Sequence, residues 1–143
     1  MNINISNPRA YFDYDIKHTF IAGLALTGAE VKSVKNGNMS LLGAYVTVGN
    51  AGVTLINAHI GAYKYTQNTN YNPTQTRKLL LQKKEINELL GKEKGLVIVP
   101  LEIFTTPKGW LKIKLGIGKT KKKTDKREAI KKRDLTRELK KNF

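Results

Sequence analysis

The chain has 143 residues and carries 26 Lys and Arg against 11 Asp and Glu, a formal net charge of +15 at pH 7. Its length fits a single domain, and its charge favours a polyanionic partner such as a nucleic acid. The absence of cysteine excludes a disulfide framework and a thiolate metal site, which leaves His18, His59 and carboxylates as possible metal ligands.

No segment has the pattern of a secretion signal or a membrane anchor. The first ten residues lack a charged start followed by a hydrophobic run. The longest apolar stretch, residues 20–26, is far below the roughly 20 residues that span a bilayer. We therefore expect a cytoplasmic protein that does not insert into membranes.

The N-terminal half is predicted to consist mainly of short strands separated by turns. Two strands of less regular alternation are expected over Tyr11–Ile16 and Leu24–Lys35, the second closed by Asn36-Gly37. Tyr45–Val48 and Val53–Asn57 flank a Gly-Asn-Ala-Gly segment at hairpin spacing, which predicts a β-hairpin.

The middle of the chain contains a loop and the one internal helix that the sequence supports well. Thr66–Thr76 is polar, with three Asn and one Pro, which predicts a surface loop. Leu79-Leu80-Leu81 fits either a helix or a strand. In Gln82–Leu90 the apolar residues lie on one helical face, and Gly91 is expected to end this helix.

The two strands predicted most strongly come next. In Trp110–Ile117 every second residue is aliphatic, with Lys or Gly between, so one face of the strand should be buried. Leu96–Phe104 is its expected partner across a turn that contains Pro107 and Gly109. Pro100 indicates an edge or a bulge in that partner strand.

Five or six strands with one helix predict a mainly β fold: a partly open antiparallel Greek-key barrel of the oligonucleotide-binding (OB) type, spanning residues 1–118. An antiparallel α+β sheet is the alternative.

Residues 119–143 form a separate basic tail. They hold twelve Lys or Arg against four acids, a net of +8. Because few aliphatic residues follow Ala129, we expect the tail to be disordered in isolation. Asp125 can cap a helix with Glu128 three residues on, so binding to a partner is expected to order the tail as a helix.

Catalysis is not expected, and neither is a cofactor. The two histidines lack further ligands for a zinc site, and no Walker-type phosphate loop is present. Glu30, Glu85, Glu88 and Glu102 are the carboxylates available for a catalytic pair, but surface ion pairing with nearby lysines explains most of them better.

Several residues are candidates for contact with RNA. Glu30, interpreted as an acid at the start of a strand, either pairs with a nearby lysine or accepts hydrogen bonds from nucleotide amino groups. Arg77 and Lys78 are interpreted as phosphate contacts. Trp110, beside Lys112 and Lys114, offers a base-stacking platform, as do three tyrosines near the loop, Tyr63, Tyr65 and Tyr71. Each of these aromatic side chains is equally consistent with packing.

Three blocks together resemble the SmpB family of transfer-messenger RNA-binding proteins. They are Thr-Gly-Ala-Glu-Val-Lys-Ser at residues 27–33, Asn-Pro-Thr-Gln-Thr-Arg-Lys-Leu-Leu-Leu at residues 72–81, and Asp-Lys-Arg at residues 125–127. The similarity runs from Asn-Pro-Arg-Ala at residues 7–10, through residues 57–60, to the basic tail.

The resemblance implies an OB-type barrel that binds the tRNA-like part of transfer-messenger RNA and delivers it, with elongation factor Tu, to ribosomes stalled on messages without a stop codon. The tail would enter the decoding centre and the empty messenger channel. The RNA-facing residues implied for the body are Glu30, Lys32, Asn57, His59, Arg77 and Lys78. The ribosome-contacting residues implied for the tail are Lys119, Lys121, Lys122, Asp125, Lys126, Arg127, Lys131, Lys132 and Arg133.

The chain departs from the family pattern at two positions. Thr120 stands where the family usually has a glycine before two lysines, which makes Gly116 and Gly118 the candidates for a hinge. Thr124 stands where His or Tyr is common before the Asp-Lys-Arg block, so base stacking is not expected there. From composition alone, a ribosomal or general RNA-binding barrel with a basic extension remains the alternative function. An RNA-processing enzyme is disfavoured.

Overall fold

The computed structural model describes residues 3–49, 52–64, 70–81, 84, 86–87, 91 and 95–121. Two helices and nine strands are delimited in this part of the chain. In chain order they are β1 (Asn4–Ser6), α1 (Ala10–Asp13), β2 (Tyr14–Leu24), α2 (Gly28–Lys35), β3 (Met39–Ser40), β4 (Tyr45–Gly49), β5 (Gly52–Ile56), β6 (His59–Ile60), β7 (Arg77–Leu80), β8 (Leu96–Thr105) and β9 (Leu111–Thr120).

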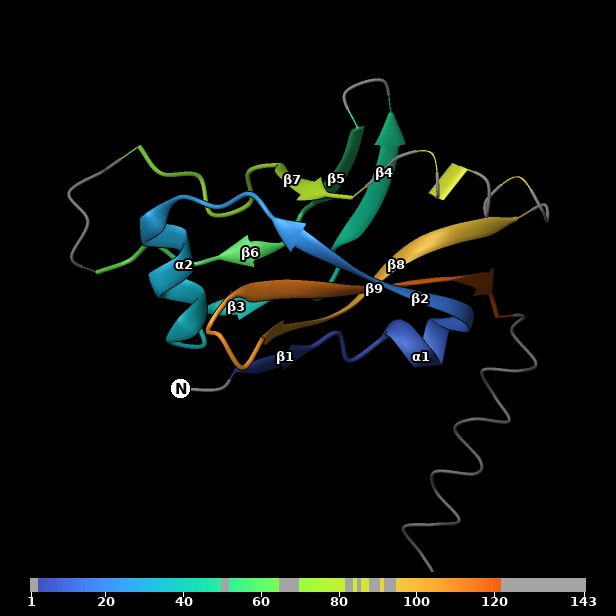
Figure 1. The fold of residues 1–143 in the computed structure, drawn as a ribbon, viewed down its shortest axis with the longest axis horizontal. Coiled ribbons are helices and arrows are strands. Elements are labelled where there is room, and N and C mark those ends of the chain that lie inside the picture. Colours follow the sequence, from blue (N-terminus) through green and yellow to red (C-terminus); the bar gives the residue numbers. More distant parts are fainter. Residues whose placement is uncertain are drawn as a thin grey trace, which may run out of the picture.

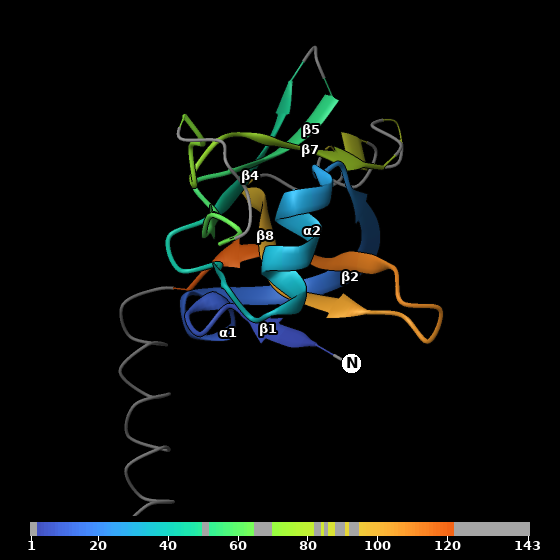
Figure 2. The same ribbon diagram turned by 90° about the vertical axis from the view of Figure 1, so that its left-hand side faces the viewer.

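The fold is a partly open antiparallel barrel, as predicted. Seven strands form one sheet in the order β1-β8-β9-β2-β7-β5-β4, and β3 pairs with β6. Although β4 and β8 are not neighbours in the ladder, they lie against each other, so the sheet curls round on itself. α2 stands at one end of the curled sheet, while α1 packs beside the start of β2 (Figures 1 and 2).

Both strong strand predictions and the hairpin are confirmed. β8 and β9 pair over most of their length, and the register shifts between Pro100 and Glu102, which is the bulge that the proline indicated. β4 and β5 form the predicted hairpin. The alternation along β9 also holds, because Ile113, Leu115 and Ile117 are fully buried. The strand total exceeds the expected five or six because β1, β3, β6 and β7 are only two to four residues long.

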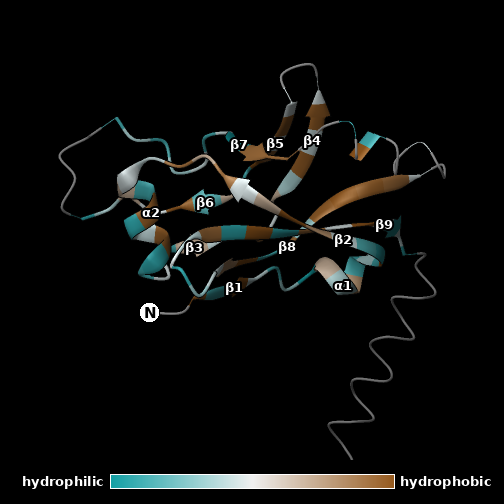
Figure 3. Ribbon diagram, viewed as in Figure 1, coloured by the Kyte–Doolittle hydropathy of each residue, from teal (hydrophilic) through white to brown (hydrophobic). Residues whose placement is uncertain are grey.

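The interior is aliphatic and draws on elements from the whole length of the chain. Val34 of α2, Leu55 of β5 and Leu79 of β7 meet the buried residues of β8 and β9. β8 is hydrophobic along most of its length, whereas much of α2 is hydrophilic (Figure 3). A second, smaller cluster lies under α1, where Ala10 packs with Val99 and Leu101.

The strand expected over Leu24–Lys35 is wrong beyond Leu24, because α2 occupies Gly28–Lys35. A capping box begins this helix: Thr27 Oγ1 accepts from the Glu30 backbone N–H at 3.2 Å, and Glu30 Oε1 accepts from the Thr27 backbone N–H at 3.1 Å. The pattern Thr-x-x-Glu is a recognised helix start. The two valines in the segment favoured a strand instead.

The strand expected over Tyr11–Ile16 is also partly wrong. Ala10–Asp13 forms a single helical turn, and β2 begins only at Tyr14. Arg9 and Asp13 are four residues apart and pair at 3.1 Å across this turn. Such an i, i+4 ion pair stabilises helical geometry.

Gly116 and Gly118, the candidates for a hinge, are held in the middle of the sheet. Gly118 pairs with Ile16 of β2 and with Val97 of β8. A Cβ atom on Gly118 would overlap the backbone carbonyl of Asp15, so glycine is required by close approach of the strands. The hinge interpretation is therefore wrong for these two glycines. β9 itself continues to Thr120, two residues past the expected domain boundary at 118.

The helix expected over Gln82–Leu90 lies mostly outside the described residues. Its described members, residues 84, 86 and 87, are helical, and Ile86 is fully buried. Gly91, expected to end the helix, is itself helical. Within the described part of the chain, every helix is too short or too polar to cross a membrane.

Candidate nucleic-acid interface

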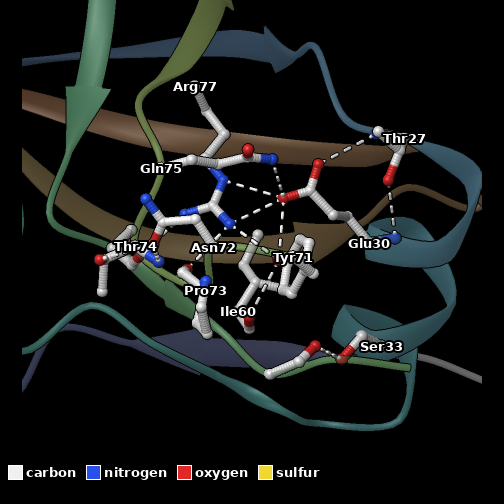
Figure 4. Close-up of polar contacts among 12 residues, drawn as sticks. Thr27, Glu30, Ser33, Ile60, Tyr71, Asn72, Pro73, Thr74, Gln75 and Arg77 are labelled. Carbon is white, nitrogen blue, oxygen red and sulfur yellow. Dashed lines mark hydrogen bonds and ion pairs between the residues drawn. The ribbon is translucent and has the colours of Figure 1, made fainter. Parts of the chain in front are cut away.

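A buried ion pair joins α2 to the start of β7. Glu30 comes from the first turn of α2, and Arg77 is the first residue of β7. Arg77 Nη2 and Nε donate to Glu30 Oε2 at 2.7 Å and 3.0 Å, and the two residues are 2% and 3% exposed, Arg77 being the less exposed (Figure 4). Two charges buried this deeply are tolerated only with good geometry and further hydrogen bonds.

Further hydrogen bonds supply that support. Tyr71 Oη lies 3.0 Å from Glu30 Oε2, and Gln75 Nε2 donates to the same oxygen at 3.2 Å. Arg77 also donates to the backbone carbonyls of Ala58 at 2.6 Å and Pro73 at 2.9 Å. Every buried side-chain nitrogen and oxygen atom in the described residues has a partner. The pair therefore organises a closed polar network within the protein.

The network fixes the segment that precedes β7. Tyr71, Pro73 and Gln75 all belong to the stretch predicted as a plain surface loop, yet each makes a hydrogen bond to Glu30 or Arg77 (Figure 4). Ser33, one turn after Glu30, donates to the Gly61 carbonyl at 2.6 Å. Residues 70–76 form an irregular segment at the surface, as predicted, but hydrogen bonds from this segment tie it to Glu30 of α2 and to Arg77.

The network also determines how the Glu30 carboxyl titrates. Burial by itself raises the pKa of this group, but the hydrogen bonds from Arg77, Thr27, Gln75 and Tyr71 outweigh it and hold the pKa below its ordinary value of 4.5. A carboxyl whose pKa is lowered by folding stabilises the folded state above the unfolded pKa and loses that contribution as the pH falls through the folded pKa. Burial and the Glu30 carboxylate raise the pKa of the Tyr71 hydroxyl above 10.0, so Tyr71 stays protonated at neutral pH.

The structure corrects the expected placement of Glu30 and Arg77. Both were expected to face RNA, but their charged groups face each other in the interior. The alternative for Glu30, a surface pair with a nearby lysine, is also wrong, because its partner lies 47 residues away. Glu30 belongs to the block at residues 27–33, and Arg77 belongs to the block at residues 72–81. The polar side chains of these two residues hold α2 and β7 together, so they serve the fold.

The other four body candidates are exposed, but they lie on different elements. Lys32 is on α2, with Nζ 5.6 Å from the ring centroid of Tyr63. Asn57 has a φ of 64° between β5 and β6 and donates to the Gly43 carbonyl at 3.3 Å, so it shapes a turn. His59 is in β6, and Lys78 is in β7.

Lys78 belongs to a basic and apolar surface on the outside of the sheet, which we call the outer face. In antiparallel strands, directly paired residues point to the same side of the sheet. Ile21 pairs with Lys114, Gly23 pairs with Lys112 and Leu80, and Lys78 pairs with Thr54. The outer face consists of Ile21, Thr54, Lys78, Leu80, Lys112 and Lys114.

Sequence reasoning missed the two apolar members of the outer face. Ile21 is 61% exposed and Leu80 is 59% exposed, although both sit in hydrophobic runs that suggested burial. Lys78, Lys112 and Lys114 lie around them. Glu102 pairs with Lys114 and points to the same side of the sheet, so it brings one negative charge to the edge of this surface. The alternation along β7 was the available signal, because Arg77 and Leu79 are buried while Lys78 and Leu80 are exposed.

A surface with lysines around exposed apolar side chains suits nucleic acid. Ammonium groups neutralise phosphates, and apolar side chains contact sugars and base faces that are not stacked in a helix. In the described residues, no group of three or more His, Asp or Glu is placed to hold a metal ion. The lysines and the exposed apolar side chains of the outer face therefore favour binding of a polyanion.

The described part of the basic tail, residues 119–121, is attached to the barrel. Lys119 lies in β9, paired with Asp15 and Leu96. The Lys121 backbone N–H donates to the Asp13 carbonyl at 2.9 Å, and its Nζ donates to the Tyr11 carbonyl at 2.8 Å. The remaining tail residues predicted to contact a ribosome lie outside the described residues: Lys122, Asp125, Lys126, Arg127, Lys131, Lys132 and Arg133.

Comparisons with known proteins agree on one family. The model of the family described as SmpB protein matches residues 4–143. The chain is 48% identical over 140 residues to an SsrA-binding protein of Elusimicrobium minutum, covering 96% of this chain and 88% of the relative. An SsrA-binding protein of Geobacillus kaustophilus is 43% identical over 139 residues, covering 96% and 89%. A solved chain described as "tmRNA-SmpB: a journey to the center of the bacterial ribosome" is 38% identical, with a TM-score of 0.66. The match covers 89% of this chain and 94% of the solved chain.

Proposed function

This chain belongs to the SmpB family, and we propose that it binds the tRNA-like domain of transfer-messenger RNA and delivers it to stalled ribosomes for trans-translation. The observation that carries the proposal is the match to this family along nearly the whole chain. The net charge of +15 supports it, because RNA binding draws most of its affinity from phosphate neutralisation. The protein acts here as a binding factor, delivered to the ribosome together with elongation factor Tu.

We assign RNA recognition in the body to the outer face. Lys78, Lys112 and Lys114 bind phosphates, while Ile21 and Leu80 contact sugars and exposed base faces. Lys32, Asn57 and His59 are further candidates for contact, since all three are exposed. Glu30 and Arg77 act as positioning residues, because their buried pair holds α2 and residues 70–76 in place beside β7.

Replacing Lys78, Lys112 and Lys114 together with glutamine should weaken binding of the tRNA-like domain of transfer-messenger RNA. Each lysine that no longer neutralises a phosphate should reduce the slope of log affinity against log salt by roughly one. The measurement is the dissociation constant over a series of salt concentrations that includes about 150 mM, where non-specific binding is weak. An unrelated structured RNA of equal length is measured in parallel.

A matched control shows whether the loss of affinity depends on the position of the lysines or only on the total charge of the protein. Replacing Lys17, Lys64 and Lys84 with glutamine removes the same charge from exposed positions outside the outer face. This control should retain most of the affinity and the preference for the tRNA-like domain. If both triple variants lose affinity equally, the outer face is not the binding surface. If the unsubstituted protein shows no preference between the two RNAs, the proposed function itself fails.

We propose that the tail acts on the ribosome, in the decoding centre and the empty messenger channel, and adds little to RNA recognition by the body. Deleting residues 125–143 should abolish tagging of stalled products while affinity for the tRNA-like domain stays largely unchanged. The measurements are a tagging reaction in a reconstituted translation system and an RNA-binding titration.

The tail also separates the proposed function from a general RNA-binding barrel with a basic extension, for which affinity would fall as the positive charge is removed. A variant with residues 125–143 in scrambled order leaves β9 intact and keeps the charge of +8 on residues 119–143. It should bind RNA normally and still fail in tagging. Normal tagging by the scrambled variant would show that charge alone suffices, against the proposed role of the tail.

A further inference from the structure

A hollow of about 480 Å³ lies between α2 and the turn that joins β8 to β9. The walls of the hollow are mainly apolar, and two lysines line it as well. The residues around it are Leu24, Leu26, Val31, Lys35, Lys108, Gly109, Trp110 and Leu111.

Trp110 is the feature of this hollow that packing does not explain. Its side chain is 67% exposed, more than any other large apolar side chain in the described residues. The backbone that carries it is well held, because the Trp110 N–H donates to Thr106 Oγ1 at 3.2 Å and its carbonyl accepts from the Thr106 N–H at 2.8 Å. An indole that is carried by a well-held backbone and left open to solvent beside an apolar hollow is suited to bind a flat ligand.

The charges around the hollow indicate which flat ligand fits. Lys35 and Lys108 line the hollow, whereas no carboxylate of the described residues does. A nucleotide combines a flat base, which stacks on an indole, with a phosphate, which an ammonium group neutralises. An apolar peptide side chain would use the walls and leave both lysines without a partner of opposite charge.

The hollow adjoins one end of the outer face. Leu24 and Leu111 are the sequence neighbours of Gly23 and Lys112, so they point to the opposite side of the sheet and pack toward the core. Trp110 comes two residues before Lys112, just before β9 begins. An RNA strand that crosses the outer face along β9 toward the β8–β9 turn therefore reaches the opening beside Trp110.

We propose that the hollow binds one unstacked nucleobase of the bound RNA, with the base stacked on Trp110 and the neighbouring phosphates held by Lys35 and Lys108. This inference rests on the proposed function and adds to it a specific base site. It assigns a ligand to a tryptophan that sequence reasoning treated equally as packing or as stacking.

The only tryptophan of the chain makes the site directly observable. Stacking of a base on the indole should quench its fluorescence. The probes are a single-stranded RNA hexanucleotide and a ribose-phosphate chain of the same length without bases, added to the full-length protein at the same ionic strength. We expect quenching by the hexanucleotide and little change with the abasic chain. An equal response to both probes, or no response to either, would overturn the proposal.

Substitutions then test whether Trp110 contributes to affinity. Trp110→Ala should weaken binding of a labelled hexanucleotide by roughly five-fold or more, since stacking on an aromatic side chain contributes about 1–3 kcal/mol per base. Binding of the abasic chain should not change. Tyr11→Ala is the matched control, because Tyr11 is an aromatic residue with 57% exposure outside the hollow. Equal losses of affinity for the hexanucleotide in the two variants would contradict the proposed base site.

Two further measurements keep the base site distinct from the proposed function. Lys35→Gln with Lys108→Gln should weaken binding of the hexanucleotide and of the abasic chain alike. The preference of the unsubstituted protein for the tRNA-like domain over an unrelated RNA tests the proposed function alone, so it can hold even if Trp110 proves irrelevant. Quenching by an apolar helical peptide and not by the hexanucleotide would assign the hollow to a protein partner and contradict the proposal.

Discussion

Replacing Arg77 with methionine should lower the free energy of unfolding by roughly 3–5 kcal/mol, the usual cost of removing one partner from a buried ion pair. Methionine fills most of the space but offers no donor to Glu30. The carboxylate, 3% exposed, then keeps only the hydrogen bonds from Thr27, Gln75 and Tyr71. Urea denaturation at neutral pH, followed by circular dichroism, measures the change.

Lys78→Met provides a matched control for this prediction. Lys78 is the next residue along β7, and it is exposed where Arg77 is buried. An exposed substitution of this kind usually changes stability by about 0.5 kcal/mol or less. Adding Glu30→Gln to Arg77→Met should recover part of the loss, because the double variant no longer buries an uncompensated charge. Equal unfolding midpoints for Arg77→Met and Lys78→Met would contradict the role assigned to the pair.

The same pair provides a second readout through pH. Because the folded pKa of Glu30 lies below 4.5, its contribution to stability is present above that pH and is lost as the pH falls through the folded value. A Glu30→Gln variant should therefore lose less stability than the unsubstituted protein over this acidic window. A general loss of packing would not produce this difference, since it does not depend on the titration of residue 30.

The second large effect is expected at Gly118. Gly118→Ala should destabilise the barrel by on the order of 3 kcal/mol, because the added methyl group meets the Asp15 backbone carbonyl, which cannot move without disturbing the pairing of β2 with β9. Thermal and urea unfolding of the variant measure the loss. A flexible hinge at this position would instead tolerate alanine.

Gly28→Ala is the control for that substitution. Gly28 begins α2, has no atom within 4 Å of an added Cβ, and does not have a positive φ. Alanine there should be neutral or should stabilise the helix by up to about 1 kcal/mol. If Gly118→Ala changed stability as little as Gly28→Ala, the result would contradict the close contact between β2 and β9 at this position.

Local sequence patterns were sufficient to predict strands whose buried and exposed residues alternate regularly along the chain. The alternation over residues 110–117 predicted β9 and its buried face, and Pro100 predicted the bulge in β8. They failed where two local signals competed. Valines at 31 and 34 favoured a strand, while the Thr27 and Glu30 capping box favoured the helix that forms.

The candidate site depended more on tertiary structure than the fold did. Glu30 and Arg77 were both selected as RNA-facing from the sequence, but they are buried and their charged groups pair with each other. Ile21 and Leu80 were not selected, because an isolated hydrophobic run gives no sign that its alternate members point outward. Pairing of β2 with β7 and β9 is what brings them beside the lysines of the outer face.

The sequence by itself determined the charge of +15, the strands of strongest alternation and, through its three blocks, the family. These properties depend on residue identities and short spacings, so they can be recognised along the chain. Only the tertiary structure decided which residues face inward and which lie together on an exposed surface. The physical reason is that a partner 47 residues away, such as Arg77 for Glu30, is brought into contact by the packing of whole elements, which no local pattern encodes.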